Sequence, residues 1–333
     1  MKERVLPTMI EGTSRAAHWE RRARVAAIIV TYNPRTDSVA RNVALVRAQV
    51  DHVIIVDNGS RQDILVSLNA LADAGNCSLI ALGKNSGIGA AQNQGIGYAR
   101  QLLISSGADL PEFRYFLLLD HDSEPSCDMV TRLIRADQAL RSQGVDVGAV
   151  GPVIVDSRTT TRGRFVRHGR MGISRIPCRT EGTMAVDFLI ASGTVIRDDV
   201  IDRVGALNEA LFIDHVDTEW CLRATACGLK LFAVCDATLE HSLGDDVIRL
   251  WFGRWREVFV HSPLRDYYMC RNTVLLLQGT PMTWAWRMFL IGRMVASVVF
   301  FCALVPPRRT RAIFVARAIA DGISQRVGAV VLR

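Results

Sequence analysis

The chain has 333 residues, of which 49% are hydrophobic and 22% are charged. This length allows one large α/β domain with extensions or two modest domains, and the apolar content excludes a mostly disordered chain. The formal net charge is +7, and the excess lies at the C-terminal end, because residues 242–333 hold 13 Arg, no Lys and five acidic residues. Such an excess can bind nucleic acid, an anionic membrane or an acidic substrate.

The cysteines and the first residues bear on the compartment. None of the eight cysteines forms a Cys-x-x-Cys pair, and Cys221, Cys227 and Cys235 lack zinc-ribbon spacing. We interpret them as buried thiols in a reducing compartment. Residues 1–24 mix acidic and basic side chains without an apolar core, so we expect an N-terminal extension rather than a secretory signal. Both features predict a cytoplasmic protein.

Short apolar runs alternate with helical patterns over the first 120 residues. Nearly continuous runs of Val, Ile and Leu are typical of parallel strands buried on both faces, and the alternation predicts an open doubly wound α/β sheet. The expected strands are 25–31, 52–57, 78–83 and 115–120, and the expected helices are 37–50, 61–74 and 87–107.

Polar residues directly follow each of these strands. Ligands of open α/β sheets bind beyond the carboxyl ends of the strands, so we expect these loops to converge on one site. The loops are Thr31-Tyr32-Asn33-Pro34, Asp57-Asn58-Gly59-Ser60, Lys84-Asn85-Ser86-Gly87 and Asp120-His121-Asp122.

The regular alternation ends at about residue 145. Strands are expected at 147–155 and 188–194, and a helix at 217–227, while the polar, Gly-rich segment 159–175 is predicted to be a loop or hairpin. Apolar helices with scattered Arg follow from residue 263 onward.

The stretch 282–305 is apolar but is interrupted by Arg287 and Arg293. Its longest run without a charged residue has twelve residues, whereas a spanning helix needs about 20 apolar residues. We therefore favour an amphipathic helix at a membrane surface over a buried helix of the main domain. Trp284 and Trp286 favour a membrane over a polynucleotide, so no nucleic-acid partner is expected.

Two carboxylates, Asp120 and Asp122, end an apolar strand and favour a hard divalent cation, Mg²⁺ or Mn²⁺, bridging to a diphosphate. The alternative is that Asp122 or Ser123 caps a helix starting near residue 126. His241 follows another apolar run and is either a further metal ligand, a diphosphate contact or a structural histidine.

The two central loops each have a functional and a structural interpretation. Asp57 can accept a hydrogen bond from the ring N–H of uracil or thymine, although Asn58-Gly59 also forms an ordinary turn. Small residues around Gly87 let a diphosphate or ribose approach a helix start, or else serve helix-to-sheet packing.

Three acids, Asp214, Asp217 and Glu219, precede a helix. Asp217 is the best-placed candidate for a base that takes a proton from an attacking hydroxyl. The alternative is that Asp217 and Thr218 only stabilise the first turn of the helix.

In this order, the motifs between about residues 25 and 244 resemble the family 2 glycosyltransferases of the GT-A fold. Ser192-Gly193 and Cys221-Leu222-Arg223 belong to the same pattern. The segment 211–223, the Glu240-His241 pair and the later run Arg265-Asp266-Tyr267-Tyr268-x-x-Arg271-Asn272 look like bacterial dTDP-L-rhamnose transferases.

The resemblance implies a mostly parallel sheet flanked by helices, with a catalytic domain over 25–262 and a basic helical region over 263–333. The donor half is expected at about 25–125 and the acceptor half at about 126–262. Many family members have Glu-Asp where this chain has Val216-Asp217, so Glu219 or Asp214 is expected to share the work of the base.

The same resemblance assigns roles to individual residues. It makes Asp217 the catalytic base. The implied donor-binding residues are Thr31, Tyr32, Asn33, Asp57, Asn58, Asn85, Gly87, Asn93 and Asp120. The implied metal ligands are Asp120, Asp122 and His241, and the acceptor-site candidates are Ser192, Gly193, Asp214, Glu219, Arg265 and Arg271.

The implied activity is inverting transfer of L-rhamnose from dTDP-L-rhamnose to a rhamnose-containing glycolipid, converting a mono-rhamnolipid to a di-rhamnolipid at the cytoplasmic face of the inner membrane. Rhamnosyltransferases of O-antigen and other surface polysaccharides share the pattern, so a lipid-linked oligosaccharide is the alternative acceptor. A nucleotidyltransferase or an inert sugar-nucleotide-binding protein is the alternative outside the transferases. The former is expected to have a Gly-rich, Lys-containing loop after the first strand, where this chain has Thr31-Tyr32-Asn33-Pro34.

Overall fold

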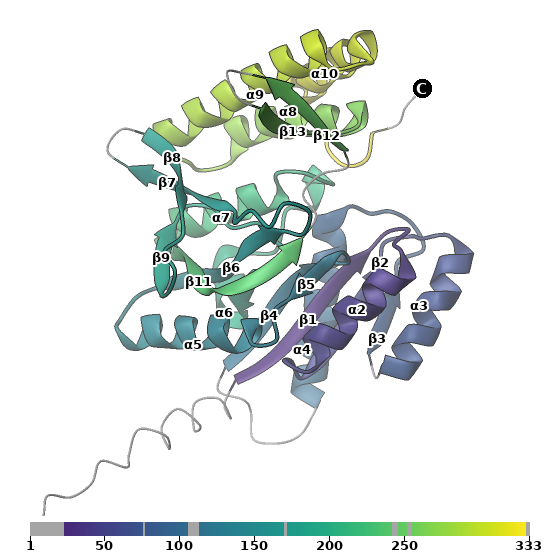
Figure 1. The fold of residues 1–333 in the computed structure, drawn as a ribbon, viewed down its shortest axis with the longest axis vertical. Helices are drawn as coiled ribbons and strands as arrows, with labels where there is room; N and C mark the ends of the chain where they lie inside the picture. The colour runs from purple at the N-terminus through teal and green to yellow at the C-terminus, as the bar shows by residue number, and fades with distance from the viewer. Residues whose placement is uncertain are drawn as a thin grey trace, which may run out of the picture.

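The computed structural model describes residues 23–75, 77–105, 113–169, 172–241, 246–251 and 255–330. The expected N-terminal extension, 1–24, lies almost wholly outside the described residues. The described chain forms a nine-stranded sheet in the order β3-β2-β1-β4-β10-β6-β11-β5, with β9 also paired to β11 (Figure 1).

The first half of the sheet is parallel, as the alternating pattern predicts. Its strands are β1 (Ala23–Thr31), β2 (His52–Asp57), β3 (Ser78–Ala81) and β4 (Phe113–Asp120). The connecting helices are α2 (Thr36–Arg47), α3 (Gln62–Gly75) and α4 (Ile88–Ser105).

The second half is mixed, because β10 lies antiparallel between β4 and β6, and β5 and β9 run antiparallel to β11. The expected hairpin in 159–175 is present as β7 and β8. The strands are β5 (Ser123–Pro125), β6 (Val147–Asp156), β7 (Arg164–Gly169), β8 (Gly172–Pro177), β9 (Thr183–Val186), β10 (Val195–Arg197) and β11 (Lys230–His241). The helices are α5 (Met129–Ser142), α6 (Asp198–Val204), the short 3-10 helix η1 (Glu209–Leu211) and α7 (Val216–Ala226).

The predicted strand at 188–194 is wrong, because this segment is a loop and the strand, β10, begins at Val195. Gly193 has a φ of +85°, and a Cβ there would lie 2.5 Å from the ring of Pro152. Its backbone N–H donates to the carbonyl of Leu118. The apolar run therefore bends at Gly193 against the end of β4 instead of continuing as a strand.

Each face of the sheet is covered by its own set of helices. Side chains such as Ile28 and Leu118 pack with α4, α6 and α7, whereas their neighbours Ile29 and Leu117 pack with α2, α3 and α5. This follows from the two-residue period of a strand, which sends successive side chains to opposite faces. The central strands are apolar at nearly every position because both faces are buried.

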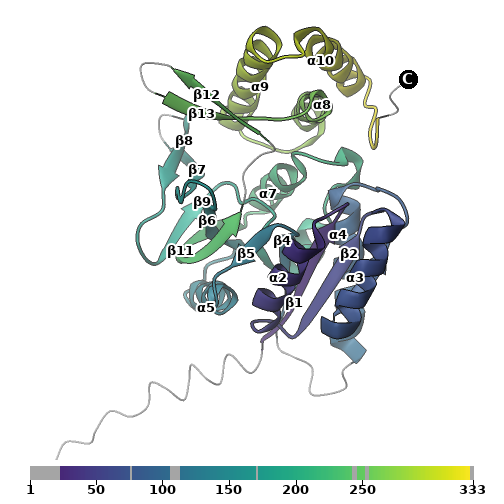
Figure 2. The same ribbon diagram turned by 45° about the vertical axis from the view of Figure 1, so that its right-hand side comes forward.

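The C-terminal part lies beyond the carboxyl ends of the parallel strands (Figures 1 and 2). It consists of a hairpin and three helices. These elements are β12 (Asp246–Trp251), β13 (Trp255–Val260), α8 (Pro263–Gly279), α9 (Trp284–Leu304) and α10 (Arg308–Ile323).

Helix α9 corrects one expectation from the sequence. It continues through Arg287 and Arg293 for 21 residues, and its most apolar stretch of 18 residues has a mean hydropathy of 1.8. By length and composition alone the helix could cross a membrane. Only 6% of that 18-residue stretch is buried in the protein. The expectation counted the apolar run only from residue 294 onward, whereas the helix also includes the apolar residues around Arg287 and Arg293, and these keep its mean hydropathy high.

The interpretation of all eight cysteines as buried thiols is also wrong. Cys178 and Cys235 form a disulfide with their Cα atoms 5.5 Å apart. Among the remaining six, Cys127 and Cys227 are exposed. The two bonded cysteines are 57 residues apart in the chain, so their proximity depends on the tertiary fold.

Candidate active site

The loops after β1 and β2 are joined through Asp57, whose side chain is buried. One carboxylate oxygen accepts from the hydroxyls of Thr31 and Ser60, and the other accepts from the backbone N–H groups of Gly59 and Ser60. Because a carboxylate has about four acceptor sites, the protein already occupies them. Asp57 thus fixes the loop, and its contact with a nucleobase stays a prediction.

The loop after β3 is held by two asparagines. The Asn58 amide donates to Oδ1 of Asn85 at 3.1 Å and accepts from the backbone N–H of Ser86 at 2.8 Å. Gly87 has a φ of +90°, and a Cβ there would lie 2.5 Å from the carbonyl oxygen of Phe212. The absence of a side chain at Gly87 lets this loop touch the acidic segment 211–219.

The other proposed donor residues of this region occupy different positions. Tyr32 is 49% exposed, and Asn33 ties its loop to the β2 loop through Ser60 and Arg61. Asn93 lies on α4 and contacts Leu207 and Glu209. Its partners make Asn93 a support for the segment that precedes α7, and a contact of Asn93 with the donor stays a prediction.

Asp120, Asp122 and His241 form one cluster, as expected. Each offers a ligand atom, and all these atoms lie within 4.8 Å of one another. Burial, reinforced by the charge of Asp122, raises the pKa of Asp120, and His241 opposes the shift. Two carboxylate oxygens and one imidazole nitrogen at this spacing fit a divalent cation such as Mn²⁺ or Mg²⁺.

Two serines hydrogen-bond to members of this cluster. The Ser192 hydroxyl accepts from the backbone N–H of Asp120 at 3.1 Å and lies 2.7 Å from the hydroxyl of Ser123. Ser123 in turn lies 3.1 Å from Nδ1 of His241. The residue before α5 is Asp128, so neither Asp122 nor Ser123 caps that helix and the capping alternative is excluded.

The acidic segment before α7 has an unusual backbone. Phe212, Asp214 and His215 all have φ between +61° and +66°, a region that costs about 1 kcal/mol or more for residues other than glycine. The amide of Asn272 on α8 holds this backbone, since its Nδ2 lies 3.0, 2.7 and 2.9 Å from the carbonyl oxygens of Leu211, Ile213 and Asp214.

Asp217 lies in the first turn of α7, where its carboxylate accepts from the backbone N–H of Thr218 at 2.7 Å. Burial, with the nearby charges of Asp214 and Asp120, raises its pKa to about 6. A carboxylate with that pKa can accept a proton near neutral pH. The cap position of α7 belongs to His215, and Asp217 stabilises the first turn as the alternative interpretation expected, so its role as the base stays a prediction.

Of three acceptor-site candidates in this region, one lies near Asp217 and the other two make contacts that stabilise the protein. Arg265 pairs with Asp214 at 2.7 Å, close to Asp217. Glu219 instead pairs with Arg223 at 2.8 Å. Arg271 is buried, donates to the carbonyls of Leu211 and Gly328, and stacks on Tyr268. In this structure Glu219 and Arg271 hold the protein together, and their contact with an acceptor stays a prediction.

Comparison with known proteins identifies the family. Residues 26–205 match the family model described as glycosyl transferase family 2. The chain belongs to glycosyl transferase family 2. A curated relative, the dTDP-rhamnosyl transferase RfbF of Shigella flexneri, is 30% identical over 258 residues, which are 77% of this chain and 80% of RfbF.

One solved structure has a TM-score above 0.5 and supports the GT-A-like fold. The structure of S. aureus TarS residues 1–349 in complex with UDP matches 91% of this chain and 83% of its own, with a TM-score of 0.51 and 12% identity. A longer S. aureus TarS chain matches with a TM-score of 0.48 and 14% identity. The protein described here spans about half of that TarS chain, 49%. At such identities the likeness shows the GT-A-like fold alone.

Sequence reasoning missed several residues of this family 2 site. Asn272 stands inside a motif that the resemblance singled out, but its three backbone contacts depend on the docking of α8. His215 is buried, lies 3.1 Å from the Thr273 hydroxyl, and has a pKa that burial lowers to about 4.

Proposed function

We propose that this chain is an inverting, divalent-metal-dependent transferase that moves L-rhamnose from dTDP-L-rhamnose to a sugar hydroxyl of a lipid-anchored acceptor. The observation that carries the proposal is the half-buried carboxylate of Asp217, which has a pKa of about 6 and lies within electrostatic range of Asp120, a member of the acidic cluster. The 30% identity to a dTDP-rhamnosyl transferase supports the donor.

In the proposed reaction, Asp217 accepts the proton of the acceptor hydroxyl while the oxygen of that hydroxyl attacks the anomeric carbon of rhamnose. The new glycosidic bond forms as the bond to dTDP breaks, and the electron pair leaves on the diphosphate. Asp120, Asp122 and His241 would hold the cation, which balances charge on the departing diphosphate. Thr218 orients the base through its backbone N–H.

We further propose a mono-rhamnolipid as the acceptor. A lipid-linked oligosaccharide of O-antigen type fits equally well, since both are amphiphiles with a sugar hydroxyl. The relative RfbF is a dTDP-rhamnosyl transferase by name, which supports the sugar that is moved but does not distinguish these acceptors.

A donor screen tests the transferase proposal. With a mono-rhamnolipid acceptor and Mn²⁺, we expect transfer from dTDP-L-rhamnose and little from UDP-glucose. Asp217→Asn should lower kcat by two orders of magnitude or more, whereas Asp73→Asn, at an exposed position of α3, should not. Near-normal turnover by Asp217→Asn contradicts the assignment.

Metal binding has its own test. Asp122→Asn and His241→Ala should each weaken Mn²⁺ binding by about ten-fold or more, measured by calorimetry on the protein without donor. Asp128→Asn, beyond the cluster and paired with Arg132, is the matched control. Unchanged Mn²⁺ affinity in both cluster variants contradicts the metal site.

We also propose that α9 rests on the cytoplasmic face of an anionic membrane. Its exposed apolar side chains Trp284, Met288, Val295 and Val299 follow helical spacing on one side of the helix. Exposed Arg308 and Arg309 begin α10 and add the positive charge that anionic lipid attracts.

Vesicle flotation tests the membrane proposal. We expect the wild-type protein to float with vesicles of phosphatidylglycerol and phosphatidylethanolamine, and a Met288→Glu and Val295→Glu double variant to float much less. Val66→Glu, at a position of α3 that is 59% exposed, is the control. Equal flotation of the double variant and the wild type contradicts the proposal.

A further inference from the structure

Asp217 is linked to α8 through a chain of polar side chains. The hydroxyl oxygen of Thr218 lies 3.4 Å from Oδ1 of Asp217. Nδ1 of His215 lies 3.4 Å from the same hydroxyl, and Nε2 lies 3.1 Å from the hydroxyl of Thr273 on α8. His215, Thr218 and Thr273 are all buried, so water has little access to these contacts. The chain therefore connects the proposed base to the C-terminal helices.

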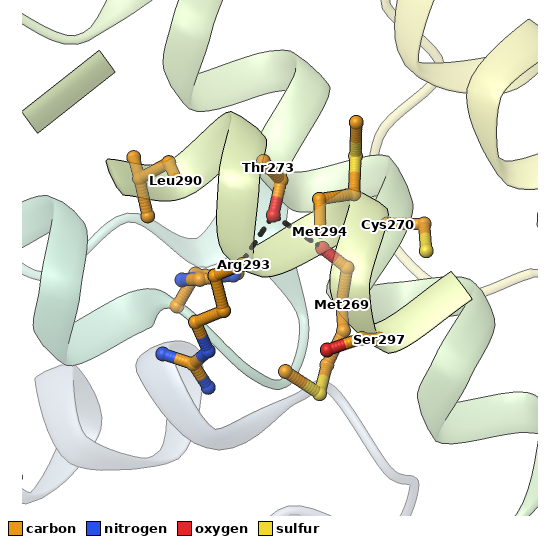
Figure 3. A pocket seen from close by; sticks show the side chains of 8 residues that line it. Met269, Cys270, Thr273, Leu290, Arg293, Met294 and Ser297 are labelled. Atoms are coloured by element: carbon orange, nitrogen blue, oxygen red, sulfur yellow. Dashed lines mark hydrogen bonds between the residues drawn. The ribbon is translucent and has the colours of Figure 1, made fainter. Parts of the chain in front are cut away.

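The contacts of Thr273 determine which nitrogen of His215 carries the proton. Dashed lines in Figure 3 mark the two contacts of the Thr273 hydroxyl. Its one hydrogen is donated to the carbonyl of Met269 at 2.8 Å, so its oxygen must accept from Nε2 of His215. Burial lowers the pKa of His215 to about 4, so the ring is neutral near pH 7. We therefore place the proton on Nε2, which leaves Nδ1 as an acceptor for the Thr218 hydroxyl.

The single hydrogen of the Thr218 hydroxyl has two acceptors. Oδ1 of Asp217 and Nδ1 of His215 lie at the same distance from the hydroxyl oxygen, 3.4 Å. An ionised carboxylate is the stronger acceptor, because hydrogen bonds to charged groups are stronger than those between neutral groups. When Asp217 is neutral that advantage is lost, and the hydroxyl can turn to the imidazole. The direction of this O–H group is therefore coupled to the ionisation of Asp217.

The same contacts leave one carboxylate oxygen of Asp217 free. The backbone N–H of Thr218 also donates to Oδ1, at 2.7 Å. Within the part of the chain that the structure describes, Oδ2 has no hydrogen-bond partner. An acceptor hydroxyl would therefore meet Oδ2 while Thr218 holds Oδ1.

We propose that Thr218 and His215 are positioning residues for Asp217. The Thr218 hydroxyl donates to the ionised carboxylate and turns to Nδ1 of His215 once Asp217 has taken a proton. The proposal rests on the proposed function and adds two residues to it. No covalent bond changes at Thr218, because only its O–H group rotates. The proton that Asp217 gains comes from the acceptor hydroxyl.

Thr218 and His215 should act on Asp217 in opposite directions. Thr218 stabilises the carboxylate by donating to it. His215 stabilises the protonated acid, because Nδ1 takes up the hydroxyl that the acid releases and is otherwise left buried without a partner. Loss of the Thr218 hydroxyl should therefore raise the pKa of Asp217, and loss of Nδ1 should lower it. A purely structural role of the two side chains predicts no such opposition.

Other charged and titratable groups also act on Asp217 or His215. They are Asp120 of β4, Asp214 before α7, Cys221 in α7, Arg293 of α9, and Arg265 of α8 through its pair with Asp214. Variants of Thr218 and His215 keep all of these groups. A change in the pKa of Asp217 among such variants therefore reports on the hydroxyl and the imidazole.

Carbon-13 NMR measures the pKa of Asp217 without relying on catalysis. The full-length protein is labelled at its Asp carboxyl carbons and titrated in EDTA, and the Asp217 signal is identified by its absence in Asp217→Asn. The variants are Thr218→Val, His215→Phe and the two combined, with His215→Asn to keep an acceptor near the position of Nδ1. Thr225→Val is the matched control, because the Thr225 hydroxyl donates to the carbonyl of Cys221 elsewhere on α7.

Thr218→Val should raise the pKa of Asp217 by about 0.5 unit or more, because the carboxylate loses a donor. His215→Phe should lower it, and His215→Asn should lie closer to the wild type. In the Thr218→Val background His215→Phe should have no further effect, since both act through one hydroxyl. Thr225→Val should leave the pKa unchanged. The acidic limb of the pH profile of rhamnosyl transfer should move in the same directions.

Unchanged pKa values of Asp217 in Thr218→Val and His215→Phe overturn the inference, and so do shifts of the same sign. An effect of His215→Phe that survives in the double variant also overturns it, as does a nitrogen-15 spectrum that places the proton of His215 on Nδ1. If His215→Phe does not fold, Thr273→Val replaces it. Without Thr273 the ring can carry its proton on Nδ1, the Thr218 hydroxyl then stays on Asp217, and the pKa should again fall.

Rhamnosyl transfer is measured separately. Its absence with every acceptor refutes the proposed function, while the titrations still decide whether Thr218 and His215 act on Asp217. Normal transfer without the opposite pKa shifts refutes the inference alone.

Discussion

The side-chain amide of Asn272 lies 2.9 Å from the carbonyl oxygen of Asp214 and also reaches the carbonyls of Leu211 and Ile213. Asn272 is fully buried on α8, so these carbonyls have little access to water. The relationship ties the C-terminal helices to the backbone that presents Asp217. A residue far along the chain thereby supports the proposed catalytic base.

Asn272→Ala should lower the free energy of unfolding by about 3 kcal/mol, because buried carbonyl groups lose their donor. It should also reduce kcat by disordering the segment before α7. Urea denaturation measures the first effect. Asn69→Ala is the control, since Asn69 donates to Leu65 within an exposed stretch of α3, and equal losses in the two variants contradict the prediction.

Gly87→Ala should destabilise the protein by about 3 kcal/mol or more. The φ of +90° disfavours any Cβ, and the added carbon would meet the Phe212 backbone 2.5 to 2.7 Å away. Gly97→Ala is the matched control in α4, where a Cβ meets nothing within 4 Å. There alanine should stabilise by about 0.5 to 1 kcal/mol, and thermal unfolding of both variants distinguishes the two effects.

Asp217→Asn should stabilise the protein at pH 8 while it abolishes activity. Folding raises the pKa of Asp217 from 3.8 to about 6, so protonation favours the folded state. This contribution is full below about pH 3.8 and is lost as the pH rises through about 6. The neutral amide avoids that loss, and one pKa unit corresponds to about 1.4 kcal/mol.

The expected gain is therefore about 2 to 3 kcal/mol at pH 8 and close to none at pH 4. Urea denaturation in EDTA at both pH values measures it. Asp73→Asn should show no such pH dependence. A gain of equal size at both pH values would mean that ionisation of Asp217 is not its cause.

The disulfide between Cys178 and Cys235 predicts how many free thiols the protein contains. Denatured, unreduced protein should show six titratable thiols, those of the free cysteines, and Cys178→Ser should show seven because Cys235 is released. Disulfides are rare in cytosolic proteins, so the count also bears on the proposed localisation. Eight thiols in the wild type would show that Cys178 and Cys235 are not bonded.

The sequence by itself determined the strands and the position of the loops at their ends. Continuous apolar runs specify strands buried on both faces, and parallel strands bring their carboxyl ends to one edge, so Asp57, Asn85 and Asp120 were placed correctly by local pattern and chain order. The antiparallel insertion of β10 was not visible, because nothing local specifies the partner of a three-residue strand.

Tertiary structure decided what each polar residue touches. Asp120, Asp122 and His241 meet because β5 pairs with β11, which aligns Ser123 with His241 across 118 residues of chain. His215 meets Thr273 because α8 packs on the segment before α7. Local pattern fixes which residues share a strand or helix, whereas burial, pKa and hydrogen-bond partners depend on elements brought together by folding, and no short stretch of sequence contains that information.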